Sequence, residues 1–550
     1  MSTSDGSAGN GRPASGRGRH RRFPVVPDSI LQRYKAKILD PSSALRLPDQ
    51  EEIHPTAYVT DRLLVSGGLG DAERSTLAQA AASLDLRLVY QDLADPRVHE
   101  IVRELGLDDD QWLYSSSALL EPAGRGPAAP PDAWALLQTY RSLLATDDPA
   151  RRLVALEHLL AATPTASGSP FTSGSPFTSG SPFTSGSPFT SGSPFTSGSP
   201  TSSYGAPGWG GRAPVNWIGA APHRLADSEL PWRRPVVAVL DTGVGKHPWL
   251  PESIVHTDVK VLGIPIGIHD PTTDPERTGV IDDPYEGALD SDSGHGTFIA
   301  GLVRQTCPDA DILAIRVMSS DGIVTESAML DALTLLALRQ LIALRRGEED
   351  QLIDVVSLSF GYYHEQPDDA AFDPLLLYPL RLLGDNGVLV VAAAGNDATD
   401  RQLFPAAFAP HPHGAVPHYE RDEVPVTSVG ALNPDRTIAL FSNAGPWVTC
   451  HRPGAALVST FPITFDGSAQ PGYRARVPAD GVRETLDPDD FSSGFGIWSG
   501  TSFAAPILAG ELAQALFSGE CGPFEPPTVE AALDRGWAAL QHVADLKRPT

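Results

Sequence analysis

Three short stretches of the sequence carry residue types that can transfer an acyl group. VLDTG contains Asp241, DSGHGTFIAG contains His295, and SGTSFAAPILAG contains Ser502. A serine hydroxyl attacks a carbonyl carbon when an imidazole takes its proton and a carboxylate orients that imidazole. Taken singly, each residue has an ordinary structural interpretation, as a turn aspartate, a solvated histidine or an N-cap serine. The three together predict a nucleophile, a general base and an orienting carboxylate.

A fourth stretch, VLVVAAAGN, ends at Asn396. An asparagine amide at the end of a buried strand can donate a hydrogen bond to a developing oxyanion. Ser502 is expected to open a helix that begins at Phe503, where unpaired N–H groups and the helix dipole favour negative charge. The sequence therefore predicts that Asn396 and the start of this helix stabilise the charge that acyl transfer creates.

The elements expected to position these residues are short apolar runs that alternate with helices. The runs are rich in Val, Ile or Leu, as is typical of parallel strands buried on both faces, and they cover residues 235–240, 312–317, 353–358 and 387–394. Glu326–Arg346 has the apolar spacing of a helix. This alternation predicts an α/β fold whose parallel sheet is covered by helices. Asp241 follows the first run, at the sheet edge where such folds place their sites.

From about Pro235 to Gly510 the sequence resembles the subtilisin-like serine proteases, the subtilases. DTG, HGTxxAG and GTSxAAP occur in the Asp, His, Ser order of this family. AAAGN, FPA at Phe404–Ala406 and FSNAG at Phe441–Gly445 accompany them. The resemblance covers about half of the chain. It implies a three-layer α/β/α fold with a mainly parallel sheet, and an endopeptidase that works through an acyl-enzyme.

The resemblance implies a role for each matching residue. Ser502 is the nucleophile, His295 the general base and then acid, Asp241 the orienting carboxylate, and Asn396 the oxyanion-hole side chain. The substrate-binding residues that it implies flank the P1 pocket: Ser359, Phe360 and Gly361 on one side, and Ala393, Ala394 and Gly395 on the other. It implies no required cofactor and no metal ligand. Structural calcium is frequent in the family, but no acidic cluster in this sequence assigns a site.

The sequence departs from the family pattern near the P1 pocket. Phe360 and Tyr362 place aromatic rings where the family commonly has smaller residues, which predicts a narrowed or reshaped pocket. Asp397 either favours a basic P1 residue or is a solvated loop acid. Two polar stretches, Leu262–Asp292 and Phe461–Phe495, look inserted and are expected to rim the cleft. A third insertion carries His411, His413 and His418, interpreted as a solvated loop or, alternatively, a metal site.

Composition excludes several classes of protein and of partner. The chain has 550 residues and a formal net charge of -26, which repels nucleic acid and anionic membranes. No apolar run approaches the roughly 18 residues of a membrane span. Three scattered cysteines cannot form a disulfide framework, and the N-terminus lacks the apolar core of a signal peptide. We expect a cytoplasmic protein whose partner is a polypeptide substrate. Secretion is the alternative if the start codon is mis-assigned.

The chain divides by composition into four parts. These are a basic, Gly/Ser-rich disordered tail at 1–50, a small α/β domain at 51–162, a linker at 163–212, and a catalytic domain at 213–550 with its core at about 235–515. The linker repeats SGSPFT five times between Ser167 and Thr196. Its phenylalanines allow an alternative role in binding a partner.

In the small domain, strand candidates at 62–66, 86–90 and 153–156 alternate with helix candidates at 71–84 and 131–145, a pattern that fits a split β-α-β layout. Its position and element order look like the family's propeptide, which assists folding and inhibits the enzyme. Its size and the long linker favour instead an accessory module that stays attached and binds a protein partner. The rival to the whole interpretation is a catalytically silent subtilase fold used for peptide binding or regulation.

Overall fold

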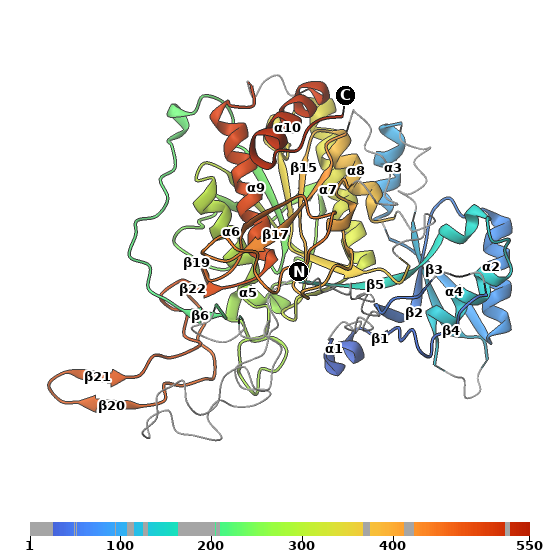
Figure 1. The fold of residues 1–550 in the computed structure, drawn as a ribbon, viewed down its shortest axis with the longest axis horizontal. Helices are drawn as coiled ribbons and strands as arrows, with labels where there is room; N and C mark the ends of the chain where they lie inside the picture. The colour runs from blue at the N-terminus through green and yellow to red at the C-terminus, as the bar shows by residue number, and fades with distance from the viewer. Residues whose placement is uncertain are drawn as a thin grey trace, which may run out of the picture.

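A computed structural model describes residues 26–48, 50, 52–93, 95–106, 115–124, 130–162, 204, 210–366, 375–411, 423–522 and 528–549. Within these ranges the chain forms a large and a small α/β domain that lie against each other (Figure 1). The SGSPFT repeats, His413 and His418 lie outside the described residues.

The large domain is built on a seven-stranded sheet in the order β18-β17-β15-β13-β7-β11-β8, and every neighbouring pair is parallel. The strands are β7 (Val236–Asp241), β8 (Val255–His256), β11 (Asp311–Arg316), β13 (Val355–Leu358), β15 (Leu389–Ala393), β17 (Val426–Leu432) and β18 (Cys450–Pro453). Along β7, Ala238 and Leu240 face one apolar core, whereas Val237 and Val239 face another. Both faces of the sheet are therefore covered, as the sequence predicts for strands of this composition.

Helices form the two outer layers. One core includes side chains of α6 (His295–Thr306), α9 (Thr501–Ser518) and α10 (Val529–Ala544), and the other includes α7 (Glu326–Arg346) and α8 (Leu377–Asp385) (Figure 1). This confirms the expected three-layer α/β/α fold and the bounds expected for α7. The Thr325 side chain accepts a hydrogen bond from Ala328 N at the start of α7, and Gly347 (φ 66°) ends it. By length and composition α7 passes the test for a membrane span, but 67% of its most apolar window is buried inside the protein.

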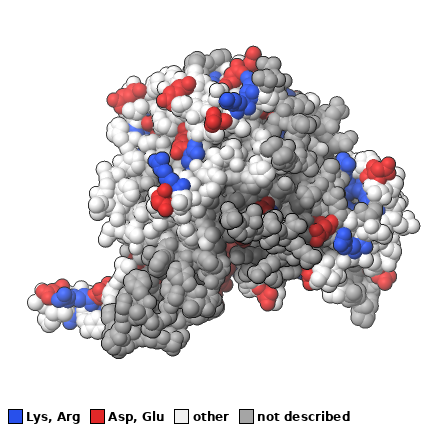
Figure 2. Space-filling model, viewed as in Figure 1, with Lys and Arg blue, Asp and Glu red and all other residues white. Residues whose placement is uncertain are grey.

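The large domain also contains shorter helices and strands. They are β6 (Ala213–Pro214), β9 (Lys260–Val261), β10 (Ile264–Pro265), α5 (Pro275–Thr278), β12 (Ile323–Thr325), β14 (Phe360–Tyr363), β16 (Leu403–Phe404), β19 (Leu457–Thr460), β20 (Arg474–Val477), β21 (Gly481–Glu484) and β22 (Phe495–Trp498). The β20–β21 hairpin projects from the domain and, like the rest of the face in Figure 2, carries acidic and basic side chains in mixed small groups. All three cysteines are free thiols.

The small domain has the split β-α-β topology that the sequence predicts. Its elements are β2 (Ala57–Val65), α2 (Asp71–Ser83), β3 (Leu86–Asp92), α3 (Pro96–Glu104), β4 (Ser116–Pro122), α4 (Ala133–Ser142) and β5 (Val154–Ala162). The antiparallel sheet has the order β5-β2-β4-β3. The sequence pattern does not predict α3 or β4, and it predicts a last strand that ends at residue 156 although β5 continues to Ala162.

The prediction of a disordered tail over residues 1–50 is wrong for the described residues that follow residue 25. Residues 28–38 form α1 (Asp28–Arg33) and β1 (Ala36–Ile38), and β1 pairs with β2. Ile30, Tyr34 and Ile38 pack on an apolar cluster that also contains Leu159 and Ile323. This segment is too short to show a clear periodicity by itself, and its order comes from packing on both domains.

Strand β5 joins the two domains into one sheet. Leu159, Leu160 and Ala161 pair antiparallel with Thr325, Val324 and Ile323 of β12. On its other edge, Ala161 and Ala162 pair antiparallel with Gly361 and Phe360 of β14. Arg33 Nη1 reinforces the contact between the domains by donating to Asp282 Oδ1 (2.7 Å) and Asp321 Oδ2 (2.8 Å).

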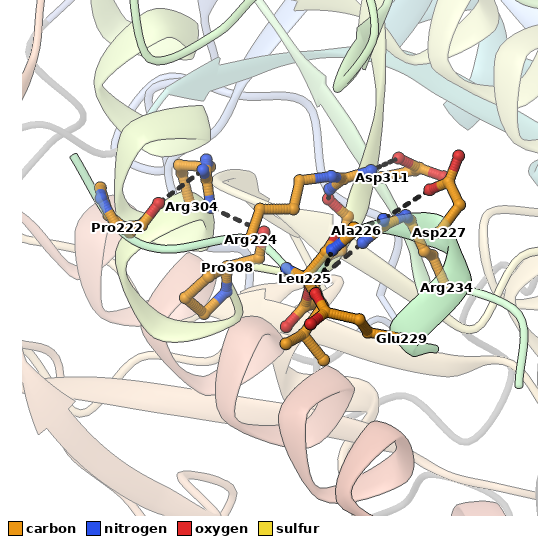
Figure 3. Close-up of polar contacts among 12 residues, drawn as sticks. Pro222, Arg224, Leu225, Ala226, Asp227, Glu229, Arg234, Arg304, Pro308 and Asp311 are labelled. Carbon is orange, nitrogen blue, oxygen red and sulfur yellow. Dashed lines mark hydrogen bonds and ion pairs between the residues drawn. The ribbon is translucent and has the colours of Figure 1, made fainter. Parts of the chain in front are cut away.

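The segment that enters the large domain is tied to the end of α6. Arg304 Nη2 donates to Pro222 O (2.7 Å), and its Nη1 donates to Pro308 O (2.6 Å) (Figure 3). Arg224 pairs with Asp311 at the start of β11, and Arg234 Nη2 donates to Asp227 Oδ1 (2.7 Å). These arginines attach the entering chain to both α6 and the sheet, and α6 begins at His295.

The core of the α7 layer makes a stability prediction. Leu336 on α7 is fully buried, whereas Leu486 is 76% exposed. Leu336→Ala is expected to lower the free energy of unfolding by about 2–5 kcal/mol because it removes apolar contacts and leaves a cavity. Leu486→Ala, the matched control, is expected to change it little. Chemical denaturation of the full chain measures both, and equal effects would contradict the described burial.

Candidate active site

A buried histidine and a buried aspartate meet at the carboxyl edge of the sheet. Asp241 is the last residue of β7 and His295 the first residue of α6. His295 Nδ1 lies 2.8 Å from Asp241 Oδ1, and both side chains are at most 1% exposed. Thr242 N donates to the same Asp241 oxygen at 2.8 Å. The carboxylate therefore fixes one ring nitrogen, and Nε2, buried and without a hydrogen-bond partner among the described residues, is left to exchange a proton.

A further buried carboxyl group, Glu276 on α5, accepts hydrogen bonds from residues adjacent to Asp241 and to His295. Glu276 Oε1 accepts from the Thr242 hydroxyl (2.6 Å) and from Gly294 N (3.0 Å), and Oε2 accepts from the Thr297 hydroxyl (2.5 Å). It thus connects the residue after Asp241 with both sides of His295. The backbones are also close, because a Cβ on Gly296 would lie 2.1 Å from Gly243 O.

Ser502 lies beside Ser359, in the first turn of α9. Its Oγ donates to Ser359 O (3.2 Å), and Ser359 Oγ donates to Ser502 O (2.8 Å). Ser502 Oγ therefore makes its described hydrogen bond to a backbone carbonyl and not to His295 Nε2. Catalytic hydrogen bonds are often long or misaligned in a free enzyme and form when substrate binds, so this geometry is compatible with a nucleophile.

The amide of Asn396 is oriented by the residue that precedes Ser502. Asn396 Oδ1 accepts hydrogen bonds from both Thr501 N and the Thr501 hydroxyl, each at 2.9 Å. These contacts fix the orientation of the amide, whose nitrogen is the hydrogen-bond donor of the side chain. Gly395 N in turn donates to Thr501 Oγ1 (3.0 Å). The structure thus brings Asn396 and the start of α9 together, as the sequence predicts.

The residues expected to bind substrate lie on two strand ends. Ala393 ends β15, and Asn443 Nδ2 donates to Ala394 O at 2.9 Å. Phe360 and Gly361 lie in β14, whose edge pairs with β5. The Phe360 ring is fully buried in the apolar core of the α7 layer, where it supports the strand.

Asp397, the acid next to Asn396, forms hydrogen bonds with other residues of the chain. Asp397 Oδ2 accepts from the Tyr363 hydroxyl at 2.6 Å, and Asp397 N donates to Asn443 Oδ1 at 3.0 Å. Asp397 is also exposed to solvent, so a solvated loop acid and an acid that favours a basic P1 residue both remain predictions.

Arg212 falls within the predicted linker, and the sequence does not predict its contact with the site. Arg212 Nη1 donates to the carbonyls of Asp290 (2.8 Å) and Ser293 (3.0 Å), two residues of the turn that leads into His295. Its guanidinium lies 5.4 Å from the Trp498 ring centroid. Arg212 and Glu276 both come from stretches of low apolar content, so no periodicity or motif marks them.

The charges around His295 act on its pKa in opposite directions. Burial lowers the pKa, but the carboxylates of Asp241, Asp292 and Glu276 outweigh this effect and raise it above the ordinary value of 6.5. Trp498 and Phe503 surround the ring with apolar surface, at centroid distances of 5.6 and 5.2 Å. The site therefore favours an imidazolium, which is the state that a base reaches during acyl transfer.

The first insertion supplies buried residues to the site, and its expected position at the rim of the cleft remains a prediction. Leu262–Asp292 contributes Glu276 to the layer beneath the two motifs, and Asp292 is itself buried. In the second insertion, Phe461, Phe465 and Phe491 belong to the core that contains α6 and α9. These three phenylalanines are the sequence feature that could have predicted the burial of the second insertion.

Comparison with known proteins shows the family to which the chain belongs. The model of the subtilase family matches residues 233–535, a range that contains Asp241, His295, Asn396 and Ser502. The chain is 26% identical to mycosin-4 of Mycobacterium tuberculosis over 322 residues, which cover 52% of this chain and 58% of mycosin-4. It is 26% identical to the major intracellular serine protease of Bacillus subtilis over 293 residues, which cover 50% of this chain and 66% of that protein.

The chain therefore spans about three fifths of the length of the curated relatives that it matches. Solved structures with a detectable likeness include the protease domain of PatA, at 22% identity and a TM-score of 0.35 over 54% of this chain and 83% of that chain. A cold adapted subtilisin-like serine proteinase is 19% identical with a TM-score of 0.33, over 58% of this chain and 88% of that chain.

The buried Glu276 makes a prediction about the pH dependence of stability. Burial raises its pKa from 4.5 to about 8, so the folded chain retains a proton that the unfolded chain loses at lower pH. Wild-type stability is therefore expected to fall, relative to Glu276→Gln, as pH rises from 4.5 to about 8. Thermal unfolding across this range measures the difference. Glu286→Gln, which changes an exposed acid of the same insertion, should follow the wild type. A constant difference between wild type and E276Q would show that Glu276 is ionised when folded.

Proposed function

Because this chain belongs to the subtilase family, we propose that it is a serine endopeptidase whose catalytic groups are Ser502, His295 and Asp241. The observation that carries the proposal is the 2.8 Å contact between His295 Nδ1 and Asp241 Oδ1 in a fully buried setting. A carboxylate in this position holds the ring in the tautomer whose Nε2 accepts a proton, and it stabilises the imidazolium that results.

The reaction has two halves. His295 takes the proton of Ser502 as Oγ attacks the substrate carbonyl, and the imidazolium then donates that proton to the leaving amine. Water, activated by His295 in the same way, hydrolyses the acyl-enzyme and restores Ser502. In both halves the negative oxygen receives hydrogen bonds from the Asn396 amide and from the backbone N–H at the start of α9. The Thr501 contacts with Asn396 Oδ1 support this assignment, because they orient the amide beside the start of α9.

The substrate is a polypeptide that binds as an added strand. Strands β12 and β14 offer their edges to β5 in this structure, and β14 leads back to Ser359, which contacts Ser502. A substrate peptide would take the place of β5 and form the same backbone hydrogen bonds. This placement favours a propeptide-like, self-inhibiting role for the small domain over the accessory module.

The silent, peptide-binding alternative has less support. A binding module has no need of an imidazole buried among carboxylates. Burial of such a cluster lowers stability, and clusters of this kind are typical of catalytic sites. The connection of Glu276 to both halves of the Asp241–His295 pair is a further cost of the same kind.

Reaction with a fluorophosphonate tests the nucleophile. The wild-type chain is expected to be labelled at Ser502, as mapped by peptide mass spectrometry, and Ser502→Ala is expected to remain unlabelled. Peptide hydrolysis by Ser502→Ala should fall by about 10⁶-fold, the loss known for subtilisin. Asn396→Ala should lose about 10²–10³-fold, again by analogy with subtilisin.

The variant Leu160→Asp serves as a control for occupation of the cleft by β5. It places a charge at a fully buried position and is expected to expel the strand. Labelling of this variant alone would mean that the wild-type site is covered. Absence of labelling in both folded proteins would contradict the proposed function and favour the silent alternative.

The pH dependence of labelling tests the base. His295 must be neutral to accept a proton, so the rate constant should fall as pH decreases through its pKa, which lies above 6.5. Asp292 is one of the carboxylates that raise this pKa. Asp292→Asn should therefore move the acid limb to lower pH, whereas Glu252→Gln, an exposed control, should not. A profile that is flat down to pH 4 would exclude a histidine base.

A further inference from the structure

His158, on strand β5 of the small domain, lies between two buried carboxylates of the large domain. His158 Nδ1 is 2.6 Å from Glu326 Oε2, at the start of α7, and His158 Nε2 is 2.9 Å from Glu365 Oε2, which follows β14. All three side chains are at most 2% exposed. Because both ring nitrogens face carboxylate oxygens, both carry protons and the ring is a cation. Burial opposes this charge, but the two carboxylates raise the pKa of His158 to about 10.

The surroundings of His158 are built for a flat cation. The Tyr362 ring stacks on it at 4.4 Å between centroids and 24° between planes. His364 lies beside it at 5.3 Å, and burial lowers the pKa of His364 to about 3, so this second ring is neutral. Arg141 donates to Gln366 at the edge of the cluster, and Glu157 on the same strand contacts Ser327. His158 is thus the cation that lies directly between Glu326 and Glu365.

The same cluster fits a metal ion less well. Nitrogen and oxygen atoms of His158, His364 and Glu365 lie within 4.8 Å of one another. However, both His158 nitrogens are already at hydrogen-bond distance from carboxylates. His364 Nδ1 accepts a hydrogen bond from Gln366 N at 2.9 Å, so the proton of this neutral ring is on Nε2, which cannot then ligate.

The register of β5 relates this cluster to the proposed nucleophile. Ala162 pairs with Phe360. In an antiparallel pair, the next residue of a bound strand lies opposite Ser359, whose carbonyl accepts from Ser502 Oγ. A peptide in the register of β5 therefore presents its scissile residue, P1, one position after that of Ala162. The position of His158 is then P6.

We propose that Glu326 and Glu365 form a binding site for a basic side chain at P6 of the substrate, which His158 occupies in the closed chain. The proposal rests on the proposed endopeptidase function and specifies its substrate class. Removal of β5 takes away the cation between the two carboxylates, and an arginine from the substrate restores the pairing. Arginine fits best, because its planar guanidinium can stack on Tyr362 and donate to both carboxylates.

The test uses the full chain and peptides with a fluorogenic amide, Ac-X-Leu-Leu-Ala-Ala-Z-aminomethylcoumarin. X is Arg, Ala or Glu, and Z is the P1 residue chosen by a positional scan. The measured quantity is the ratio of kcat/KM values between peptides, in which the fraction of open enzyme cancels. Arg is expected to exceed Ala by about tenfold or more, since hydrogen bonds to charged groups are strong, and Glu should fall below Ala.

Substitution of the two carboxylates checks the assignment. In Glu326→Gln/Glu365→Gln the Arg:Ala ratio is expected to approach one. In Glu349→Gln/Asp350→Asn, two exposed acids beyond the far end of α7, it should match the wild type. Hydrolysis that depends on Ser502 but has an Arg:Ala ratio near one in the wild type would overturn the subsite and leave the protease assignment intact. Absence of both hydrolysis and fluorophosphonate labelling, in the wild type and in Leu160→Asp, would overturn the protease assignment itself.

A second measurement applies if the cleft stays closed to peptides. In the full chain, His158→Arg should be labelled at Ser502 as slowly as the wild type, whereas His158→Gln should be labelled faster because its strand lacks the cation. Equal rates for the two variants would overturn the proposal. Stoichiometric zinc binding that is lost in His364→Ala would also overturn it, because the cluster would then be a metal site.

Discussion

The site in the large domain depends on holding two buried carboxyl groups, those of Asp241 and Glu276, beside one imidazole. Asp241 and Glu276 lie buried around one imidazole, and each is held by donors that the backbone and two threonine hydroxyls supply. Burial of a carboxyl group is costly unless its oxygens receive hydrogen bonds, and even with these donors burial raises the pKa of Glu276 to about 8. This requirement explains why the stretches before and after His295 are close-packed and rich in glycine, and why Arg212 returns from outside the sheet to satisfy the carbonyls of that turn.

The contact between the domains also depends on buried carboxylates. Here they belong to the large domain, and the small domain supplies the cation that pairs with them. The small domain offers a strand edge on each side of β5 and a cation at His158, while the large domain offers two strand edges and the carboxylates of Glu326 and Glu365. The backbone hydrogen bonds and the ion pairs are both satisfied only when β5 is in place. The docked state is therefore specific in register, because a slip of one residue would move His158 away from both carboxylates.

The sequence marks the residues proposed to do the chemistry more clearly than the residues that contact them. Asp241, His295, Asn396 and Ser502 are recognised because each lies in a stretch whose glycines and flanking strand or helix restrict its setting. Glu276 and Arg212 are not, because their partners are backbone groups and hydroxyls that only the fold brings near. The docking of β5 was also beyond the sequence: the pairing of Ala162 with Phe360 joins distant parts of the chain, and no local pattern encodes it.

If β5 and the substrate compete for one cleft, inhibition and specificity share the same interactions. Withdrawal of β5 exposes the edges of β12 and β14 and leaves Glu326 and Glu365 without their cation, so the opened state is costly until a peptide enters. A peptide that matches both the backbone edges and the charge at P6 lowers this cost most. A change that weakens the carboxylate pair therefore loosens the closed chain and, in the same step, lowers discrimination among substrates. A protease that is well restrained by its own strand is, by this reasoning, selective for peptides that resemble it.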